Sequence, residues 1–515
     1  MMKRFLSYVM GWRGLALVTY MWLILLAWVI VYINTQSKTY LVYLAGVMLF
    51  VSLYVCPKIL RRAESLSLKT ESESFTGNEK RKFFFMLLLA SFGIFFAMYI
   101  TFYPGGFSPD SLDQYAQAAG IKKYNDWHPA IHTLFSFTLP LKISGGWLGS
   151  IVLFQIVLAS LSLSYMALTL AEYGSRKYAA LFLAYILVNP ATLGILMYPL
   201  KDVAFAVSAM LSMTFALRVY FSGGKFLRPA NIFLFIVFIS SATLFRHNAV
   251  LFTFPLLLAV LFYAGKKQKA VIVTGCCVFV MAVKFILYPY LGVEKPGYRI
   301  VETTCAPMTV IANAVYEAPE KLDSDIQSFI YEVAPKEKWQ ELYAVGSYNN
   351  VKWNGINKNA IEEAGYAKIL GMTLRCLTEA PLESLRGFAA LTDMVYGICG
   401  SVDWVLLPYV HENDYGIEAG GISIPQRVFF LGMNVTRVFL KHLFWHIGVM
   451  ILVIIIFILA KSDWRKFFLS VPILAYDFGT MLFLGGNDFR FFWCTYLVFP
   501  LVLLVLLRDK GEARQ

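Results

Sequence analysis

Residues 14–33 read GLALVTYMWLILLAWVIVYI, a run without a single charged side chain. A helix of this length spans the hydrocarbon core of a bilayer. Only a helix fits here, because lipid offers no hydrogen-bond partners to exposed backbone N–H and C=O groups. The run is too long for the apolar core of a secretory signal, and no small-residue cleavage site follows it. We therefore expect a first membrane-spanning helix.

Comparable apolar runs recur along the 515 residues, of which 58% are hydrophobic and 15% charged. Soluble domains carry about 25% charged residues. The sequence therefore predicts an all-α fold, a polytopic membrane bundle of about twelve transmembrane helices. The predicted spans are residues 14–33, 39–57, 83–102, 147–170, 179–199, 203–221, 230–245, 250–264, 269–289, 446–461, 466–484 and 491–508.

The net charge of +13 is concentrated in short segments between the apolar runs. If the spans alternate and the N-terminus is cytoplasmic, every one of these basic segments lies on the cytoplasmic side, as the positive-inside rule requires. The chain is then predicted to be a multi-pass protein of the bacterial plasma membrane with both termini cytoplasmic. No basic stripe with interleaved aromatic residues is present, so a nucleic-acid partner is not expected. The basic segments are residues 58–82, 172–177, 223–228, 265–269, 461–466 and 508–515.

The same alternation divides the chain into three regions. Residues 1–289 are predicted to form an N-terminal transmembrane module with a first outer loop at about 103–146. Residues 290–445 are predicted to be a large, mostly helical extracytoplasmic region, and residues 446–515 hold the last transmembrane helices. The middle region contains Cys305, Cys376 and Cys399, and their spacing alone does not determine whether a disulfide forms. The candidate chemistry lies outside the cytoplasm.

The first outer loop is the stretch richest in ionisable residues. Asp110 falls near the start of a predicted helix, after a Ser-Pro pair typical of a capped N-terminus. One reading is therefore that Asp110 only caps this helix, and the other is that its carboxylate is catalytic. The same loop also brings Tyr103, Asp113, Asp126, Trp127, His128 and His132 close to Asp110 in the sequence.

Three further polar clusters are predicted on the same side of the membrane. Charges at the mouth of a membrane bundle are costly unless they are paired or wet, and they often mark functional sites. A structural ion pair remains an alternative, both for the Lys-Asp pair and for the Asp-Arg pair. The clusters are Lys201 with Asp202, Arg246 with His247 and Asn248, and Asp488 with Arg490.

These residue types suit the transfer of a sugar from a phosphate. A carboxylate can take the proton of an acceptor hydroxyl, and cations can hold a phosphate as its negative charge develops. Aromatic side chains can stack on sugar rings. The sequence has no nucleotide-binding fingerprint, and an outer site has no access to cytoplasmic nucleotide sugars. A lipid-linked sugar would solve this problem of supply.

The sequence resembles the GT-C type integral membrane glycosyltransferases, a group that includes the protein O-mannosyltransferases and the lipid A aminoarabinose transferase. The resemblance rests on YPGGFSPDSLDQYAQA at 103–118, YNDWHPAIHTLF at 124–135, PLKDVAFA at 199–206 and NDFRFFWCTYLVFPL at 487–501. It implies that Asp110 is the general base. It also implies that basic residues at the outer mouth contact the lipid phosphate. The adjacent pair of acidic residues frequent in the family is absent, because Ser111 follows Asp110.

The expected function is a membrane glycosyltransferase that moves a sugar from a polyprenyl-phosphate donor to a glycan, lipid or protein of the cell envelope. Asp110 is the predicted catalytic residue, and Lys201, Arg246 and Arg490 are the predicted donor-phosphate ligands. No metal ligand and no cofactor are expected, and a divalent metal is left open. The predicted substrate-binding residues are Tyr103, Asp113, Trp127, His128, His132, Asp202, His247, Asn248 and Asp488.

Other functions remain open at this point. A polysaccharide polymerase or ligase that joins lipid-linked glycans would share the topology and the outer site. A transporter or flippase for a lipid-linked or anionic substrate would use broken spans and repeated halves. The Asn189–Pro190 pair, inside a predicted span, is the one interruption of that kind. A scaffold without catalysis is the remaining alternative.

Overall fold

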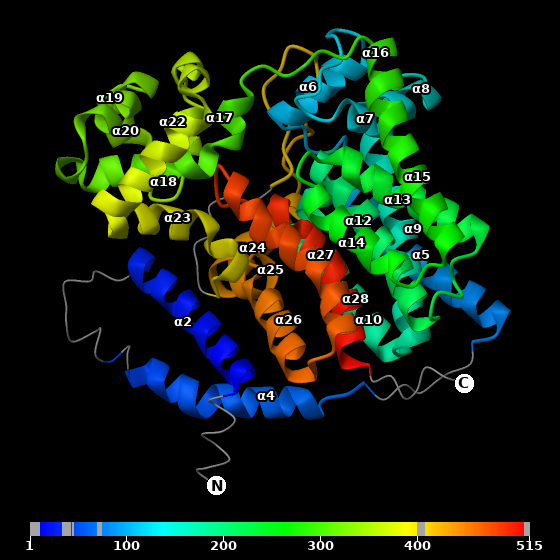
Figure 1. Ribbon diagram of the computed structural model, residues 1–515. Helices are drawn as coiled ribbons and strands as arrows, with labels where there is room; N and C mark the ends of the chain where they lie inside the picture. The colour runs from blue at the N-terminus through cyan, green and yellow to red at the C-terminus, as the bar shows by residue number, and fades with distance from the viewer. Residues whose placement is uncertain (1–10, 33–42, 44–45, 69–74, 399–406, 509–515) are drawn as a thin grey trace.

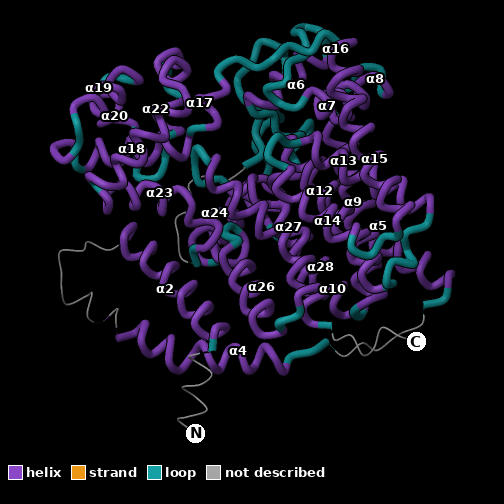
Figure 2. Tube along the Cα trace, in the orientation of Figure 1, coloured by secondary structure: helices purple, strands orange, loops and turns teal. Residues whose placement is uncertain are grey.

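The computed structural model describes residues 11–32, 43, 46–68, 75–398 and 407–508. Across these ranges the chain is helical, and no β-strand is present (Figure 2). The predicted all-α class is therefore confirmed for the part of the chain that the structure describes. Residues 39–42 and 44–45 of the second predicted span lie outside these ranges, and so does Cys399.

Seven helical segments are long and apolar enough to cross a membrane, and these indicate a membrane protein. A bent pair, α10 (Arg176–Val188) and α11 (Pro190–Leu196), turns by 64° at its break and would make an eighth span. The seven are α2 (Trp12–Tyr32), α5 (Gly77–Thr101), α9 (Ser150–Tyr173), α12 (Lys201–Phe221), the continuous α15 (Lys266–Met281), η3 (Ala282–Leu287) and α16 (Tyr288–Tyr290), α27 (Trp464–Thr480) with η5 (Met481–Phe483), and η6 (Phe489–Phe492) with α28 (Trp493–Leu507).

The predicted count of twelve spans is not confirmed. Each predicted span from 83–102 onward coincides with an apolar helix, but several of these helices have only 10–17 residues. One apolar stretch, Ala130–Ile143, falls inside the loop predicted at 103–146. The shorter helices are α7 (Ala130–Thr133), η2 (Leu134–Thr138), α8 (Leu139–Ile143), α13 (Pro229–Phe245), α14 (Val250–Leu261) and α26 (Gly448–Lys461).

Helices α12 and α28 form the centre of the bundle. In each, 78% of the most apolar window is buried inside the protein, compared with 22% for α2 and α5 and 11% for the segment that contains α15. The latter helices therefore form the periphery. Helix α4 (Cys56–Ser65), preceded by η1 (Val51–Val55), lies across one end of the bundle (Figure 1).

A separate lobe of helices stands at the opposite end of the bundle (Figure 1). Its apolar core includes Ile311, Phe329 and Trp339 and is distinct from the main core of the bundle, and Phe388 packs against both. Cys305 and Cys376 are buried there as free thiols. The lobe consists of α17 (Arg299–Thr303), α18 (Cys305–Glu317), η4 (Pro319–Lys321), α19 (Ser324–Val333), α20 (Lys336–Leu342), α21 (Asn349–Lys352), α22 (Lys358–Glu379) and α23 (Pro381–Tyr396).

The region predicted as one helical loop, 290–445, therefore has two parts. After the lobe, α24 (Ile424–Phe439) and α25 (Lys441–Phe444) return to the bundle, where Met433 and Trp445 join the main apolar core. The amphipathic pattern of α24 does not by itself predict whether this helix packs in the lobe or against the bundle, because either location buries one apolar stripe.

Candidate functional site

Asp110 lies in the first turn of helix α6 (Pro109–Ala118), near the lobe end of the bundle. The helix starts there because Ser108 Oγ accepts a hydrogen bond from the Ser111 backbone N–H and Pro109 occupies the first helical position. The side-chain cap is therefore Ser108, and the Asp110 carboxylate is left for other contacts. Its side chain remains 28% exposed.

Two glycines set the position of α6 against the bundle. Gly105 has a φ of +120°, and a Cβ there would lie 2.5 Å from the Val152 side chain on α9. A Cβ on Gly106 would lie 2.6 Å from the ring of Tyr198. Only glycine allows the loop to approach this closely. The Gly-Gly pair thus fixes Asp110 relative to the helices that carry the other charges.

Arg490 joins the end of the chain to this loop. The Nη1 atom of Arg490 lies 3.2 Å from Asp110 Oδ2, although the two residues are 380 positions apart. Asp488 orients this arginine, since its Oδ2 lies 2.8 Å from Arg490 Nε and its Oδ1 accepts from the Arg490 backbone N–H at 3.0 Å. The Asp488–Arg490 ion pair considered from the sequence is therefore present, and it belongs to the same cluster as Asp110.

His128 connects Asp110 to Lys201. His128 Nε2 lies 3.6 Å from Asp110 Oδ1, and His128 Nδ1 lies 3.0 Å from Lys201 Nζ. Because an ammonium only donates, Nδ1 accepts this hydrogen bond and the proton of a neutral ring is on Nε2, facing Asp110. Asp110, His128, Lys201 and Arg490 form a continuous set of contacts, which we call the Asp110 cluster.

The electrostatics of the cluster favour a neutral histidine and an ionised aspartate. Burial, together with the charge of Lys201, lowers the pKa of His128 to about 3. Burial of Asp110 opposes its ionisation, but His128, Arg490 and Lys201 outweigh this effect and hold the pKa of Asp110 well below its usual range. At neutral pH the cluster therefore contains one carboxylate, two cations and a neutral imidazole.

Arg246 lies in a second, more deeply buried pair. Its Nη1 forms a salt bridge with Asp202 and its Nε donates to Asn248 at 2.7 Å. Asn248 in turn donates to Thr480 Oγ1 at 2.9 Å. The guanidinium also lies 4.9 Å from the ring centre of Phe491. Asp202 therefore pairs with Arg246 and not with its neighbour Lys201, and this second pair ties α12, α13 and α27 together.

The remaining predicted substrate-binding residues have other contacts. Asp113 binds Lys122 Nζ at 2.8 Å, and Nδ1 of buried His132 accepts a hydrogen bond from Gln114 Nε2, also at 2.8 Å. Tyr103 is half-exposed and its hydroxyl accepts from Trp147. These three residues do not contact the Asp110 cluster. His247 Nε2 lies 3.2 Å from the backbone oxygen of Asp126, and Trp127 is half-buried beside His128.

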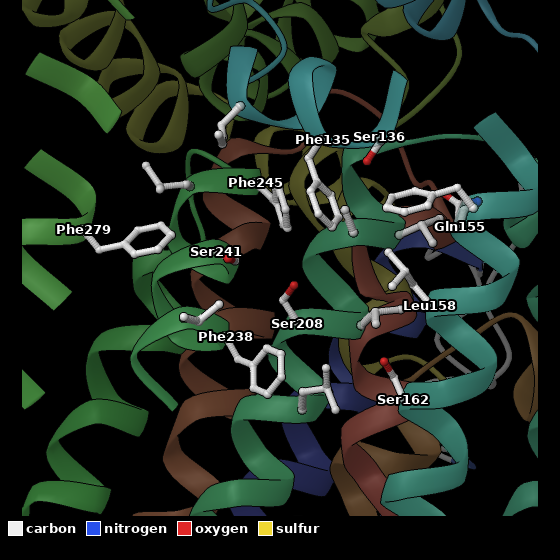
Figure 3. Close-up of a pocket in the computed structure, with 18 residues that line it drawn as sticks. Phe135, Ser136, Gln155, Leu158, Ser162, Ser208, Phe238, Ser241, Phe245 and Phe279 are labelled. Atoms are coloured by element: carbon white, nitrogen blue, oxygen red, sulfur yellow. The ribbon is translucent and has the colours of Figure 1, made fainter. Parts of the chain in front are cut away.

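An apolar cavity of about 320 Å³ lies between helices α9, α12, α13 and α15 (Figure 3). Val203 and Ala204 line it, directly after Lys201 and Asp202 in helix α12. Its walls are almost wholly apolar, with a few polar side chains such as Gln155 and Ser208. The charged cluster and the apolar cavity are thus neighbours along α12.

Sequence reasoning missed Lys284, which pairs with Asp126 at 2.9 Å. A lysine inside the predicted span 269–289 was the available signal, because such residues are rare in apolar helices. It also missed Lys352 and Glu302, a pair in the lobe at 2.9 Å. Nothing in their local sequence distinguishes them from other charged residues on a soluble surface.

Within the described ranges, no group of three or more His, Cys, Asp or Glu side chains is arranged to hold a metal ion. The chemistry available to the cluster is that of an ionised carboxylate among cations. Comparisons with known proteins add no assignment: no family model, no curated protein and no solved structure matches this chain.

Proposed function

We propose that this protein is a membrane glycosyltransferase that uses a polyprenyl-phosphate-linked sugar at the extracytoplasmic face. The observation that carries the proposal is the contact set of Asp110, His128, Lys201 and Arg490 beside an apolar cavity. A lipid-linked sugar matches this arrangement: its anionic phosphate suits the charged cluster, and its apolar chain suits the cavity. The cell-envelope acceptor, whether glycan, lipid or protein, would approach from the side of the lobe.

The proposed reaction has one bond formed and one broken at the anomeric carbon. The acceptor hydroxyl loses its proton to Asp110 while its oxygen attacks that carbon. The bond from the anomeric carbon to the phosphate oxygen breaks, and the polyprenyl phosphate leaves with the electron pair. Lys201 and Arg490 stabilise the negative charge that develops on this phosphate. Attack opposite to the leaving phosphate inverts the configuration of the sugar.

The low pKa of Asp110 has a role in this scheme. With no donor bound, the positive charges of Arg490 and Lys201 stabilise the ionised carboxylate of Asp110 and make it a weak base. A phosphate that binds these cations neutralises part of that charge, so the pKa of Asp110 rises toward its ordinary value. Donor binding would thus activate the base. Hydroxyl groups would not be deprotonated while the donor is absent.

The Asp110→Asn variant tests the proposal in membranes supplied with a labelled lipid-linked sugar. Asparagine keeps the shape and can still accept from Arg490, but it cannot take a proton. Transfer is expected to fall by at least about 1,000-fold. Asp113, the other acid of α6, contacts Lys122 outside the cluster, so Asp113→Asn should lower transfer by about tenfold at most. A well-folded Asp110→Asn protein with unchanged transfer would remove Asp110 from its role.

A second candidate, a flippase for the lipid-linked sugar, is favoured by the break between α10 and α11. Transporters place discontinuous helices at their binding sites, and here Asn189 Oδ1 caps the second half-helix by accepting from Ala191 N–H at 2.9 Å. The two candidates predict different products. A flippase moves a labelled donor across a vesicle bilayer and leaves it intact, whereas a transferase consumes it only when an acceptor is present.

A further inference from the structure

Lys284 occupies an unusual place on a peripheral, lipid-facing helix. The apolar segment Lys266–Tyr290 is the least buried of the candidate spans, and the neighbouring side chains Phe285 and Ile286 are 72% and 70% exposed. A cation among such residues is costly unless it has a partner or a function. The π-helical turn η3, Ala282–Leu287, contains Lys284, and such turns often occur at functional sites.

The partner of Lys284 is Asp126, which belongs to the loop that carries His128. Lys284 Nζ lies 2.9 Å from Asp126 Oδ2, and the other carboxylate oxygen accepts from Ala130 N–H at 3.3 Å. The lysine side chain is 32% exposed, compared with 16% for the aspartate. The cation is thus the more accessible half of the pair.

Neither Lys284 nor Asp126 lines the apolar cavity, but residues close to both in the sequence do, and we call this border the rim of the cavity. Ile131 lines the cavity. It directly follows Ala130, whose backbone N–H donates to Asp126. Phe279, five residues before Lys284, lines the cavity from α15 (Figure 3). His247 contacts the backbone oxygen of Asp126 and so links this rim to the neighbouring Arg246. A headgroup whose chain occupies the cavity would therefore pass between Lys284 and the Asp110 cluster.

We propose that Lys284 captures the phosphate of the lipid donor at the lateral rim of the cavity, and that Asp126 holds Lys284 until the phosphate displaces it. The inference rests on the proposed function for its occupant, a polyprenyl phosphate. The donor's phosphodiester carries one negative charge, as the Asp126 carboxylate does, and offers its ester oxygens as further acceptors, so it can take the same ammonium. The flexible four-carbon stem lets the ammonium move from Asp126 to the headgroup.

The test measures association rates of lipid phosphates without any sugar transfer. Full-length protein in nanodiscs receives undecaprenyl phosphate from the bilayer, or geranyl phosphate from water. A rim cation acts mainly on the association rate. Lys284→Met is expected to slow association of undecaprenyl phosphate by about tenfold. Geranyl phosphate reaches the cations from the aqueous side, so its rate should change by less than about twofold.

Three further variants separate capture from structural support. Lys284→Arg keeps the charge and should retain most of the rate. Lys321→Met removes a comparable ion pair in the lobe, with Glu383 at 2.7 Å, and should leave both rates unchanged. Asp126→Asn can still accept from Ala130 N–H through its amide oxygen but releases Lys284, so association should become faster. The opposite signs for Lys284→Met and Asp126→Asn are the signature of capture.

Two results would overturn the inference. The first is an unchanged association rate in Lys284→Met, and the second is slower association in both Lys284→Met and Asp126→Asn, which would make the pair structural. The proposed function fails separately: if the wild-type protein binds undecaprenyl phosphate in the Lys284-dependent way but transfers no sugar, lateral capture is supported and the glycosyltransferase assignment is not.

Discussion

The two ends of helix α12 carry two ionic clusters that differ in how their charges are satisfied. In the last turn, Arg218 lies 2.6 Å from Glu172, and the same carboxylate binds Lys80 at 2.7 Å. Arg218 also donates to Thr169 and lies over the ring of Tyr165. Each charged residue in this network has an oppositely charged partner, and the network ties α5, α9 and α12 together.

At the first turn, Lys201 lacks such a partner. Its ammonium contacts the neutral ring of His128, and in the part of the chain that the structure describes no carboxylate lies within 4 Å of it. Asp110 on the other side of His128 is part-exposed. A cluster built only for stability would pair its charges as the Arg218 end does. The comparison indicates that the Lys201 end leaves charge available to a ligand.

Between the two ends of α12, the largest difference is expected from removing that available charge. Lys201→Met should reduce kcat/KM for a lipid-linked sugar by about 100-fold, because one cation of the phosphate site is lost. The thermal stability of the protein should change little, since a half-buried cation without a carboxylate partner is replaced by an apolar side chain. Lys80→Met, at the other end, should leave kcat/KM unchanged. Equal activity losses in both variants would contradict the functional difference between the two ends.

The opposite pattern is expected at the paired end. Glu172→Gln leaves Arg218 without its carboxylate and should lower the free energy of unfolding by about 3 kcal/mol. The measurement is the thermal midpoint in detergent, with donor turnover below that temperature as the second reading. Turnover per folded molecule should be unchanged. A protein of normal stability, or a folded one without activity, would show that this end is not a purely structural network.

A smaller effect is expected in the pH dependence of Arg490→Gln. Arg490 helps to keep the pKa of Asp110 low, so Asp110 is ionised even in mildly acidic solution. Without this cation the carboxylate takes up a proton at a higher pH. The acidic limb of the kcat/KM profile should therefore move upward by about one pH unit. Asp110 is not the titrating base if the limb stays where it is in the wild-type protein.

The smallest effect concerns His128 and stability. Its folded pKa of about 3 lies below the value of about 6.5 for an unfolded histidine. The unfolded chain therefore binds the proton first, and the stability contributed by neutral His128 is complete above pH 6.5 and is lost as the pH falls toward 3. His128→Gln should weaken the dependence of the thermal midpoint on pH in that window. Part of the slope should remain, because burial also lowers the pKa of His247.

Much of the helical architecture could be predicted from the sequence. Apolar runs such as 83–102 and 203–221 coincide with α5 and α12, because an apolar run of that length must be helical in lipid. The runs do not say how many helices cross the membrane. Helix α14, Val250–Leu261, satisfies the composition but not the length. Its packing among other helices, and not its own sequence, determines its role.

Candidate residues of the site could be predicted as a set, but their partners could not. Asp110, Lys201 and Arg490 were predicted because a charged side chain at the mouth of an apolar bundle is energetically costly and often functional. The pairing of Asp202 with Arg246, and the separation of Asp113 and His132 from the cluster, depend on side-chain positions. The pairing of Lys284 with Asp126 could not be predicted either, because the two residues lie 158 positions apart.

The sequence by itself determined that this chain is helical, rich in apolar segments long enough for a membrane, and supplied with a few acids and bases between them. It could do so because hydrophobicity and helix period are local properties, readable residue by residue. Only the tertiary structure decided that Arg490 meets Asp110 and that an apolar cavity lies beside Lys201. Contacts between distant segments depend on how whole helices pack, and packing depends on shapes that no single segment encodes.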